Sequence, residues 1–353
     1  MIRENIQKLV DGNNLSTEES EETMKEIMTG NASNAQIAAF LTALRIKGET
    51  VEELTAFAKV MRENCLRIHP NVDGRLIDTC GTGGDKIKTF NISTAAAFVV
   101  AGAGIAIAKH GNRAVTSRSG SADVLERLGV NLNMEPKAVE NAIEQVGIGF
   151  MFAPAFHPAM KYAVAPRKEI GIRTVFNLLG PLTNPACANA QLLGVYDAKL
   201  TVPLAYTLKS LGCEEAMVVY GLDGLDEIST LGKTVISRLK DGEVTTIETE
   251  PKDFGVKQTN IKALKGATPE KNAEVLFKIL SGNSAKDNPK REIVLVNAAA
   301  GIIVGGEAED FNYSIEASHK SIDSGAAYKK LKMLIKASNG DLSKLEELET
   351  KYA

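Results

Sequence analysis

The feature that most constrains the fold of this 353-residue chain is an alternation of short apolar runs with helical patterns from residue 76 onward. Parallel β-α-β units produce such an alternation, because each parallel strand needs a crossover helix before the next strand. The runs predicted as buried strands are 76–80, 104–108, 148–152, 191–196 and 215–220, with helices predicted over 122–128 and 137–146. The chain is therefore predicted to be an α/β protein with a mostly parallel central sheet.

The first 65 residues follow a different, helical pattern. Ser16 is followed by Glu19, and Thr50 by Glu53, which is the spacing of a capping box at a helix start. Pro70 interrupts the helical periodicity between residues 67 and 74. We therefore predict a small helical domain over residues 1–65, a connector, and an α/β domain over residues 74–348.

Two later segments depart from the parallel alternation. Residues 233–250 are predicted to form an antiparallel pair that turns at Asp241-Gly242, a dipeptide typical of tight hairpins. From about 314 to 348 the pattern returns to helix.

Composition excludes several classes of protein. The formal net charge of −3 argues against a protein that holds nucleic acid through bulk positive charge. Four cysteines stand singly, without the spacing of a zinc site or a disulfide framework, as expected for free thiols in a reducing cytosol. The N-terminus lacks the apolar run of a signal peptide, and no apolar span reaches membrane length. We expect a cytoplasmic protein with no membrane and no nucleic-acid partner.

A glycine-rich segment follows the first predicted strand. Gly81, Gly83 and Gly84 let backbone amides approach an anion, and the helix predicted behind them adds partial positive charge. Lys86 stands where the third glycine of a dinucleotide fingerprint belongs, and no Gly-Lys-Ser/Thr of a Walker A loop follows. The alternative interpretation is a tight turn whose helix is capped by Asn91 or Ser93.

A basic segment follows the second predicted strand. Lys109, Arg113 and Arg118 lie within ten residues of one another among serines, a threonine and glycines, a mixture suited to phosphate oxygens. The alternative is a solvated basic loop, which the apolar elements on both sides disfavour. Together with the glycine-rich segment, it predicts a ligand with two phosphate-bearing ends.

Two adjacent carboxylates, Asp226 and Glu227, follow the fifth predicted strand. They are either ordinary turn residues or ligands of Mg²⁺, which prefers one or two carboxylates together with waters and substrate phosphates. Since parallel strands place their carboxyl ends at one edge of a sheet, we expect these carboxylates near the two phosphate-binding segments.

These residues belong to a series of motifs that resembles the anthranilate phosphoribosyltransferase family from the helical N-terminus to about residue 330. The motifs are Gly81-Thr-Gly-Gly-Asp85, Asn91-Ile-Ser-Thr94, Lys109-His-Gly-Asn-Arg113, Gly120-Ser-Ala-Asp-Val-Leu-Glu126, Phe152-Ala-Pro-Ala-Phe-His-Pro-Ala-Met160, Gly171-Ile-Arg-Thr174, Phe176-Asn-Leu-Leu-Gly-Pro-Leu-Thr-Asn-Pro185 and Asp223-Gly-Leu-Asp-Glu227. The resemblance implies a nucleoside phosphorylase-like fold, with helices from about 157–185 returning to the small domain. It also implies a homodimer and a magnesium-dependent pentosyltransferase, which moves phosphoribosyl from phosphoribosyl pyrophosphate to the amine of anthranilate in tryptophan biosynthesis.

The resemblance also implies roles for particular residues. Phosphoribosyl pyrophosphate would be held by Gly81, Gly84, Asp85, Thr89, Asn91, Ile92, Ser93, Thr94, Lys109, His110, Gly111, Asn112, Arg113, Ala114, Val115, Thr116, Ser117 and Ser121. Magnesium would be served by Ser93, Asp226 and Glu227. Anthranilate would be bound by Gly81, Asn112 and Arg167, with His110, His157 and Tyr162 lining its path. This sequence departs from the family pattern at Lys86, where glycine is usual, and at Tyr220, where many relatives have histidine.

The expected mechanism needs no dedicated acid or base, because the aniline nitrogen of anthranilate is already neutral at pH 7. Mg²⁺ and Lys109 are expected to stabilise the charge of the departing pyrophosphate, and Arg167 to clamp the carboxylate of anthranilate. His110 is either a general base or a positioning group, and positioning is preferred. The rival functions are a pyrimidine nucleoside phosphorylase, a nucleic-acid-binding relative and a dinucleotide oxidoreductase, which the glycine spacing disfavours.

Overall fold

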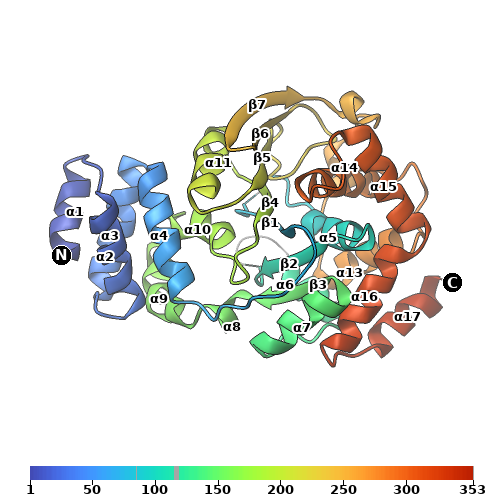
Figure 1. Cartoon of the computed structure of the whole chain (residues 1–353), viewed down its shortest axis with the longest axis horizontal. Helices are drawn as coiled ribbons and strands as arrows, with labels where there is room; N and C mark the ends of the chain where they lie inside the picture. Colours follow the sequence, from blue (N-terminus) through green and yellow to red (C-terminus); the bar gives the residue numbers. More distant parts are fainter. Residues whose placement is uncertain (85, 115–118, 353) are drawn as a thin grey trace.

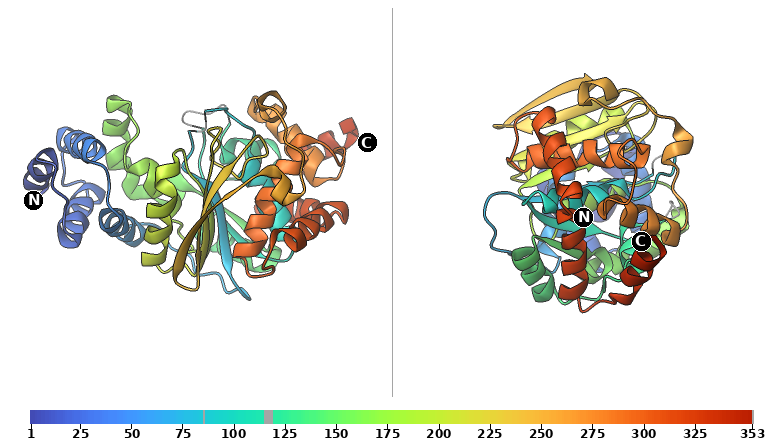
Figure 2. Two further views of the ribbon diagram at one scale, coloured as in Figure 1. Left: turned by 90° about the horizontal axis from the view of Figure 1, so that it is seen from above. Right: turned by 90° about the vertical axis from the view of Figure 1, so that its right-hand side faces the viewer.

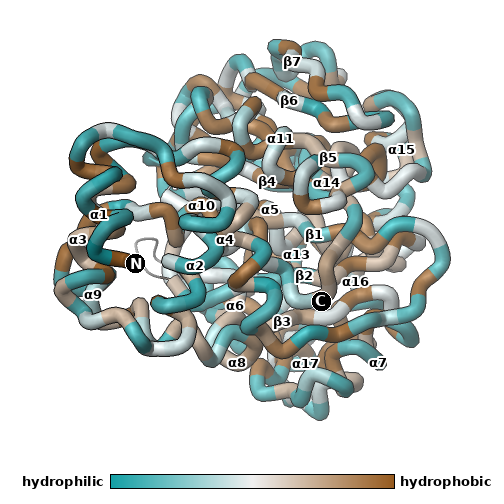
Figure 3. Tube along the Cα trace, turned by 60° about the vertical axis from the view of Figure 1, so that its left-hand side comes forward, coloured by the Kyte–Doolittle hydropathy of each residue, from teal (hydrophilic) through white to brown (hydrophobic). Residues whose placement is uncertain are grey.

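The computed structural model describes residues 1–84, 86–114 and 119–352, and shows a helical unit joined to a larger α/β unit (Figure 1). The helical unit begins with α1 (Ile2–Val10), α2 (Thr17–Met28), α3 (Asn34–Lys47) and α4 (Val51–Glu63). The predicted capping boxes at Ser16 and Thr50 are both present, because each hydroxyl accepts the N–H of the glutamate three residues on. Hydrophilic and hydrophobic stretches alternate along these helices, as amphipathic packing requires (Figure 3).

Within the described ranges, seven strands form one sheet in the order β3-β2-β1-β4-β5-β6-β7. Neighbours among β1 to β5 pair in parallel, whereas β6 and β7 pair antiparallel, so the predicted α/β fold with a mostly parallel sheet is confirmed. The predicted hairpin turn at Asp241-Gly242 is confirmed, with both residues at positive φ. The strands are β1 (Leu76–Gly81), β2 (Ala106–Gly111), β3 (Ile148–Phe152), β4 (Ala190–Gly194), β5 (Glu215–Gly221), β6 (Thr234–Lys240) and β7 (Glu243–Thr249).

The second strand differs from its prediction in a way that matters for the site. It was expected over 104–108, but it begins at Ala106 and continues to Gly111. The reason is pairing with β3, which places Lys109 opposite Phe150 and His110 opposite Met151. Lys109 and His110 therefore belong to the sheet and not to the loop that follows it.

Helices cover both faces of the sheet, which Figure 2 shows edge-on between them. Successive strand residues point to opposite faces, so Leu192 joins the core under the C-terminal helices while Leu193 joins the core shared with the helical unit. The remaining helices are α5 (Ile92–Gly102), α6 (Ser121–Arg127), α7 (Pro136–Val146), α11 (Thr201–Ser210), α12 (Ile261–Leu264), α13 (Pro269–Leu280), α14 (Pro289–Val304), α15 (Phe311–Asp323), α16 (Ala326–Ala337) and α17 (Ser343–Tyr352). None of the helices in the described ranges combines the length and the apolar character that a membrane span requires.

The segment between β3 and β4 leaves the sheet and packs against the N-terminal helices (Figure 1). Its helices are α8 (Ala153–Phe156), α9 (Lys161–Ile170) and α10 (Phe176–Leu182). α9 contacts α3 and α2, and α10 contacts α4. The contact is close, because a Cβ on Gly30 would lie 2.6 Å from the ring of Tyr162 on α9. The helical unit thus contains chain from two separate parts of the sequence.

Candidate active site

The candidate site lies where the parallel strands end at one edge of the sheet. The loop after β5 crosses this edge so closely that glycine is needed beneath it. A Cβ on Gly81 would lie 2.8 Å from Oδ2 of Asp226, and a Cβ on Gly194 would lie 1.6 Å from the carbonyl oxygen of Asp226. The carboxylate of Asp226 therefore lies at the end of β1, next to the glycine-rich segment.

The second carboxylate of this loop reaches the start of α5. Oε1 of Glu227 accepts a hydrogen bond from the backbone N–H of Ser93 at 3.1 Å. Asn297, a fully buried residue on α14, exchanges hydrogen bonds with the backbone of Ile228 at 2.9 and 3.0 Å and so fixes the loop. Ser93, Asp226 and Glu227, which the resemblance assigned to magnesium, are thereby brought to one edge of the sheet.

These three residues fit the needs of a magnesium ion. No cluster of three or more His, Cys, Asp or Glu side chains with metal-binding geometry occurs in the described part of the chain. Mg²⁺ does not need one, since it uses one or two carboxylates and takes its other oxygen ligands from water and phosphate. Two carboxylates beside a loop that is predicted to bind an anion suit a magnesium ion that arrives with a phosphorylated substrate.

The glycine-rich loop (residues 82–90) rests against the carboxylate loop. Gly83 and Gly84 have φ values of +69° and +89°, a conformation that disfavours other residues. The N–H of Lys86 donates to the carbonyl of Gly224 at 3.3 Å, and Thr89 bridges to Lys265. On the first turn of α5, the hydroxyl of Thr94 is buried without a hydrogen-bond partner. Asp85, predicted to bind phosphoribosyl pyrophosphate, lies outside the described residues.

Lys109 is buried and turned toward the backbone. Its Nζ donates to the carbonyl of Thr79 at 2.5 Å, and burial lowers the pKa of its ammonium group. Asp78 lies beside it and accepts hydrogen bonds from the N–H of His110 at 3.3 Å and from Nδ2 of Asn184 at 2.8 Å. Burial raises the pKa of Asp78 to about 6, while the charge of Lys109 acts against this rise. The prediction that Lys109 belongs to the segment after the second strand is wrong, because β2 continues to Gly111 and Nζ of Lys109 bonds the backbone of β1.

The basic segment after β2 is shaped by acidic and amide side chains. Arg113 forms ion pairs with Asp123 at 3.1 Å and Glu126 at 2.8 Å, so much of its charge is balanced within the chain. Asn91 precedes α5, but its side chain does not cap the helix. It donates to the carbonyl of Ser119 at 3.0 Å and accepts from the Ser119 hydroxyl, which ties together the two segments predicted to bind phosphate. The predicted residues Val115, Thr116 and Ser117 lie outside the described residues.

Further residues predicted to bind phosphoribosyl pyrophosphate lie at the start of α5 and around the end of β2. Ile92 is buried in the first turn of α5, and Gly111 ends β2. A Cβ on Gly111 would lie 2.2 Å from Oγ of Ser121, which itself donates to the carbonyl of Asn112 at 3.4 Å. The N–H of Ala114 donates to Asp123 at 2.9 Å. These contacts fold the segment back toward α6.

Two histidines form a pair next to β2. The rings of His110 and His157 lie 5.0 Å apart between centroids, and Nε2 of each is buried without a hydrogen-bond partner. Burial lowers the pKa of His110 to about 3 and that of His157 to about 4, so both rings are neutral at pH 7. A group with so low a pKa is a poor general base at neutral pH, which supports the positioning role expected for His110.

The remaining residues predicted to serve the aromatic acid lie on α9. The guanidinium of Arg167 stacks on the ring of Phe176, with its carbon 5.1 Å from the ring centroid, and burial lowers its pKa. Among the described residues, none forms an ion pair with Arg167, so its charge has no carboxylate partner within that part of the chain. Tyr162 packs over Gly30 of the helical unit.

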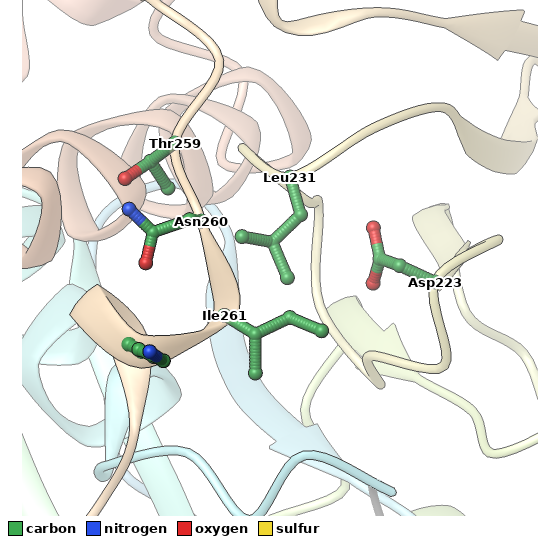
Figure 4. Close-up of a pocket in the computed structure, with 6 residues that line it drawn as sticks. Asp223, Leu231, Thr259, Asn260 and Ile261 are labelled. Atoms are coloured by element: carbon green, nitrogen blue, oxygen red, sulfur yellow. The ribbon is translucent and has the colours of Figure 1, made fainter.

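An open pocket of about 670 Å³ adjoins the carboxylate loop on the side of residues 259–262 (Figure 4). Asp223 faces Leu231 and Ile261 across it, and Thr259, Asn260 and Lys262 complete its lining. Neither Asp226 nor Glu227 lines this pocket. It is therefore a neighbour of the candidate site and not the site itself.

Several residues of the site were not assigned a role by the sequence. Asp78 acts on Lys109 through its charge, and Asn184 donates a hydrogen bond to Asp78. A charged residue within a predicted buried strand was the available signal for Asp78. Gly194 permits the approach of Asp226, and Arg173 contacts the glycine-rich loop. Arg173 stands in the motif Gly171-Ile-Arg-Thr174, but no local pattern gives either residue a role, because each acts on a segment far away along the chain.

Two family models match this chain, one for the α/β unit and one for the N-terminal helices. The glycosyl transferase family a/b domain matches residues 73–328, and the glycosyl transferase family helical bundle domain matches residues 3–65. The anthranilate phosphoribosyltransferase of Acetivibrio thermocellus is 50% identical over 343 residues, which cover 97% of this chain and 98% of that protein. The crystal structure of the anthranilate phosphoribosyltransferase of Thermus thermophilus is 39% identical, with a TM-score of 0.88 over 95% of this chain and 99% of that one. The Saccharomyces cerevisiae enzyme in complex with PRPP and Mg is 29% identical, also with a TM-score of 0.88, over 96% of this chain and 98% of that one.

Proposed function

Because this chain belongs to the anthranilate phosphoribosyltransferase family, we propose that it transfers the phosphoribosyl group of phosphoribosyl pyrophosphate to the amine of anthranilate. The products are N-(5-phosphoribosyl)anthranilate and pyrophosphate, a step of tryptophan biosynthesis. The observation that carries this proposal is the meeting of Asp226 with the end of β1 and of Glu227 with the start of α5. That arrangement puts two carboxylates beside the backbone amides of a glycine-rich loop, which suits an anion that brings a metal ion with it.

The proposed donor site combines the backbone amides of the glycine-rich loop with the first turn of α5. The partial positive charge of the helix N-terminus and the N–H groups around Gly83 and Gly84 favour a bound phosphate. Asp226, Glu227 and the hydroxyl of Ser93 would hold Mg²⁺, which when bound supplies positive charge to the departing pyrophosphate. The buried ammonium group of Lys109 bonds Thr79 of β1, and so fixes this strand and contributes positive potential to the proposed donor site.

The proposed acceptor site lies between α9 and the histidine pair. Arg167 has no carboxylate partner among the described residues, and its planar guanidinium matches the carboxylate of anthranilate in a two-point contact. Gly81 ends β1, and Asn112 directly follows β2. His110 and His157 offer neutral ring nitrogens. Since the aniline nitrogen attacks without prior deprotonation, these groups serve orientation and exclusion of water, and proximity supplies the main part of the rate.

The experiment is a fluorescence assay with the full chain. Mixing anthranilate with phosphoribosyl pyrophosphate and Mg²⁺ should quench anthranilate fluorescence, and omission of either addition should prevent this. Thymidine with inorganic phosphate should give no turnover, whereas turnover with this pair would favour the pyrimidine nucleoside phosphorylase alternative. A protein that is folded but shows no loss of fluorescence would contradict the proposal.

We further propose that the helical domain comprises residues 1–65 joined by helices from about 157–185, that the α/β domain comprises residues 74–348, and that the chain works as a cytoplasmic homodimer. Contacts of α9 with α3 support the division. We propose that exposed apolar side chains of the helical unit, among them Ile46 on α3 and Val164 on α9 at 82% and 56% exposure, form the dimer contact. Four free thiols agree with a reducing compartment. Sedimentation equilibrium would test the dimer, and a Val164→Glu variant should shift it toward monomer.

A further inference from the structure

Arg173 makes a contact that the proposed function does not yet use. It follows Gly171, the residue with φ of +63° that ends α9, and its Nη2 donates to the carbonyl of Gly84 at 2.9 Å. A Cβ on Gly84 would lie 2.1 Å from this Nη2 and 2.7 Å from Cζ. The guanidinium therefore occupies the space that a side chain at position 84 would need, so a side chain there would displace it, and the φ of +89° itself favours glycine.

The same guanidinium rests on an aromatic ring. Cζ of Arg173 lies 4.5 Å from the ring centroid of Tyr196, which follows β4, and this is a favourable distance for cation–π stacking. Burial raises the pKa of the Tyr196 hydroxyl, and the charges of Arg45, Glu49 and Arg173 also act on that pKa. Arg45 lies on α3, so Tyr196 stands between the helical unit and Arg173.

A loop that binds anions through its N–H groups must direct its carbonyl oxygens elsewhere, because a carbonyl dipole facing a phosphate repels it. The carbonyl of Gly84 accepts a hydrogen bond from Arg173. On this basis, and resting on the proposed function, we propose that Arg173 is a positioning residue that holds the glycine-rich loop at Gly84 in its phosphate-binding form, with Tyr196 as its platform. Arg173 and Arg167 lie six positions apart on the segment formed by α9 and the turn after it, so one segment serves both substrates.

Hydrogen exchange without any substrate tests the positioning role directly. In the wild type, the N–H groups of Thr82 and Lys86 are bonded to Gly194 and Gly224, and peptides covering residues 82–90 report on their protection. Arg173→Ala should speed exchange of these peptides about tenfold, the change expected for losing a charge-assisted hydrogen bond. Lys168→Ala, which removes an exposed cation from the same segment, is the matched control and should leave exchange unchanged.

Steady-state kinetics separates positioning from direct contact with phosphate. Arg173→Ala should raise the KM for phosphoribosyl pyrophosphate about tenfold and leave the KM for anthranilate unchanged. Tyr196→Leu should give part of the same rise, whereas Tyr196→Phe, which keeps the ring, should behave as the wild type.

Two results would overturn the proposal. One is unchanged exchange at residues 82–90 in both Arg173→Ala and Tyr196→Leu. The other is a kinetic defect in Arg173→Ala that Tyr196→Leu does not share, because this would show that Arg173 binds the phosphate itself. Failure of the proposed function is a different result, since the wild type would then consume no anthranilate while the exchange comparison would still be decisive.

Discussion

Oε1 of Glu227 accepts the backbone N–H of Ser93 at 3.1 Å, so the carboxylate loop after β5 is tied to the first turn of α5. The two residues are 134 positions apart in the sequence. Their contact joins the proposed metal-binding residues to the helix N-terminus of the proposed phosphate site. Any change that moves one of these two segments is therefore expected to alter the other.

The carboxylate pair should be required for turnover with magnesium. Replacing both residues, Asp226→Asn with Glu227→Gln, should lower kcat at least about a hundredfold, because the pyrophosphate charge would no longer be neutralised as it leaves. The fold should persist, since a glutamine oxygen can still accept the N–H of Ser93. Anthranilate fluorescence across a Mg²⁺ titration measures this, and near-normal activity at limiting Mg²⁺ would defeat the metal assignment.

Lys109→Met should affect both stability and the donor substrate. It leaves the carbonyl of Thr79 without its buried donor and Asp78 without its nearby cation, at a cost of about 1–3 kcal/mol in the free energy of unfolding. The KM for phosphoribosyl pyrophosphate should rise more than that for anthranilate. Urea denaturation and kinetics with each substrate varied provide the test, with Lys137→Met on exposed α7 surface as control. A rise limited to the anthranilate KM would show that Lys109 serves the acceptor.

Arg167→Ala should raise the anthranilate KM by about ten- to hundredfold, as expected for loss of a charge-assisted pair of about 1.5–3 kcal/mol. The KM for phosphoribosyl pyrophosphate should barely move. Because Arg167 also stacks on Phe176, thermal unfolding must be measured in parallel. A variant that melts several degrees lower but keeps its anthranilate KM would show that Arg167 is structural.

Gly194→Ala should disturb the site without touching a substrate. The added Cβ would lie 1.6 Å from the carbonyl oxygen of Asp226, so the carboxylate loop must shift. We expect a loss of about 1–3 kcal/mol in the free energy of unfolding, together with weaker activation by Mg²⁺. Gly180→Ala is the matched control, because a Cβ there meets no atom within 4 Å. Equal behaviour of the two variants would refute the close approach of Asp226.

The buried histidine pair should make the protein sensitive to acid. The folded pKa of His157, about 4, lies below its ordinary value of 6.5, so the unfolded chain binds the proton more readily. The stability that this histidine contributes is present above pH 6.5 and is lost as the pH falls toward 4, amounting to about 2 kcal/mol by pH 5. Denaturation of the wild type and of His157→Gln at pH 7 and pH 5 should show the smaller acid loss in the variant. Equal losses would mean that His157 is protonated in the folded protein.

Much of the architecture could be predicted because its signals are local. A hydroxyl such as that of Ser16 caps the helix that starts beside it, and Asp241-Gly242 favours a hairpin through its own backbone conformation. The alternation of apolar runs with helices gives the parallel sheet, and a parallel sheet places its loops at one edge. The approximate neighbourhood of Gly81, Lys109 and Asp226 follows from that rule together with the family motifs.

The direction of individual side chains and the close contacts between segments could not be predicted, because they depend on parts of the chain that meet only after folding. Pairing of β2 with β3 decided that Lys109 points to Thr79 within the sheet, although its neighbours in sequence suggested an open basic loop. The need for glycine at position 194 arises from the backbone of Asp226, which approaches from 32 positions away. The sequence by itself therefore determined the elements, their order and the edge at which chemistry occurs. Only the tertiary structure decided which way each side chain points, because that depends on packing between parts of the chain that carry no local signal for one another.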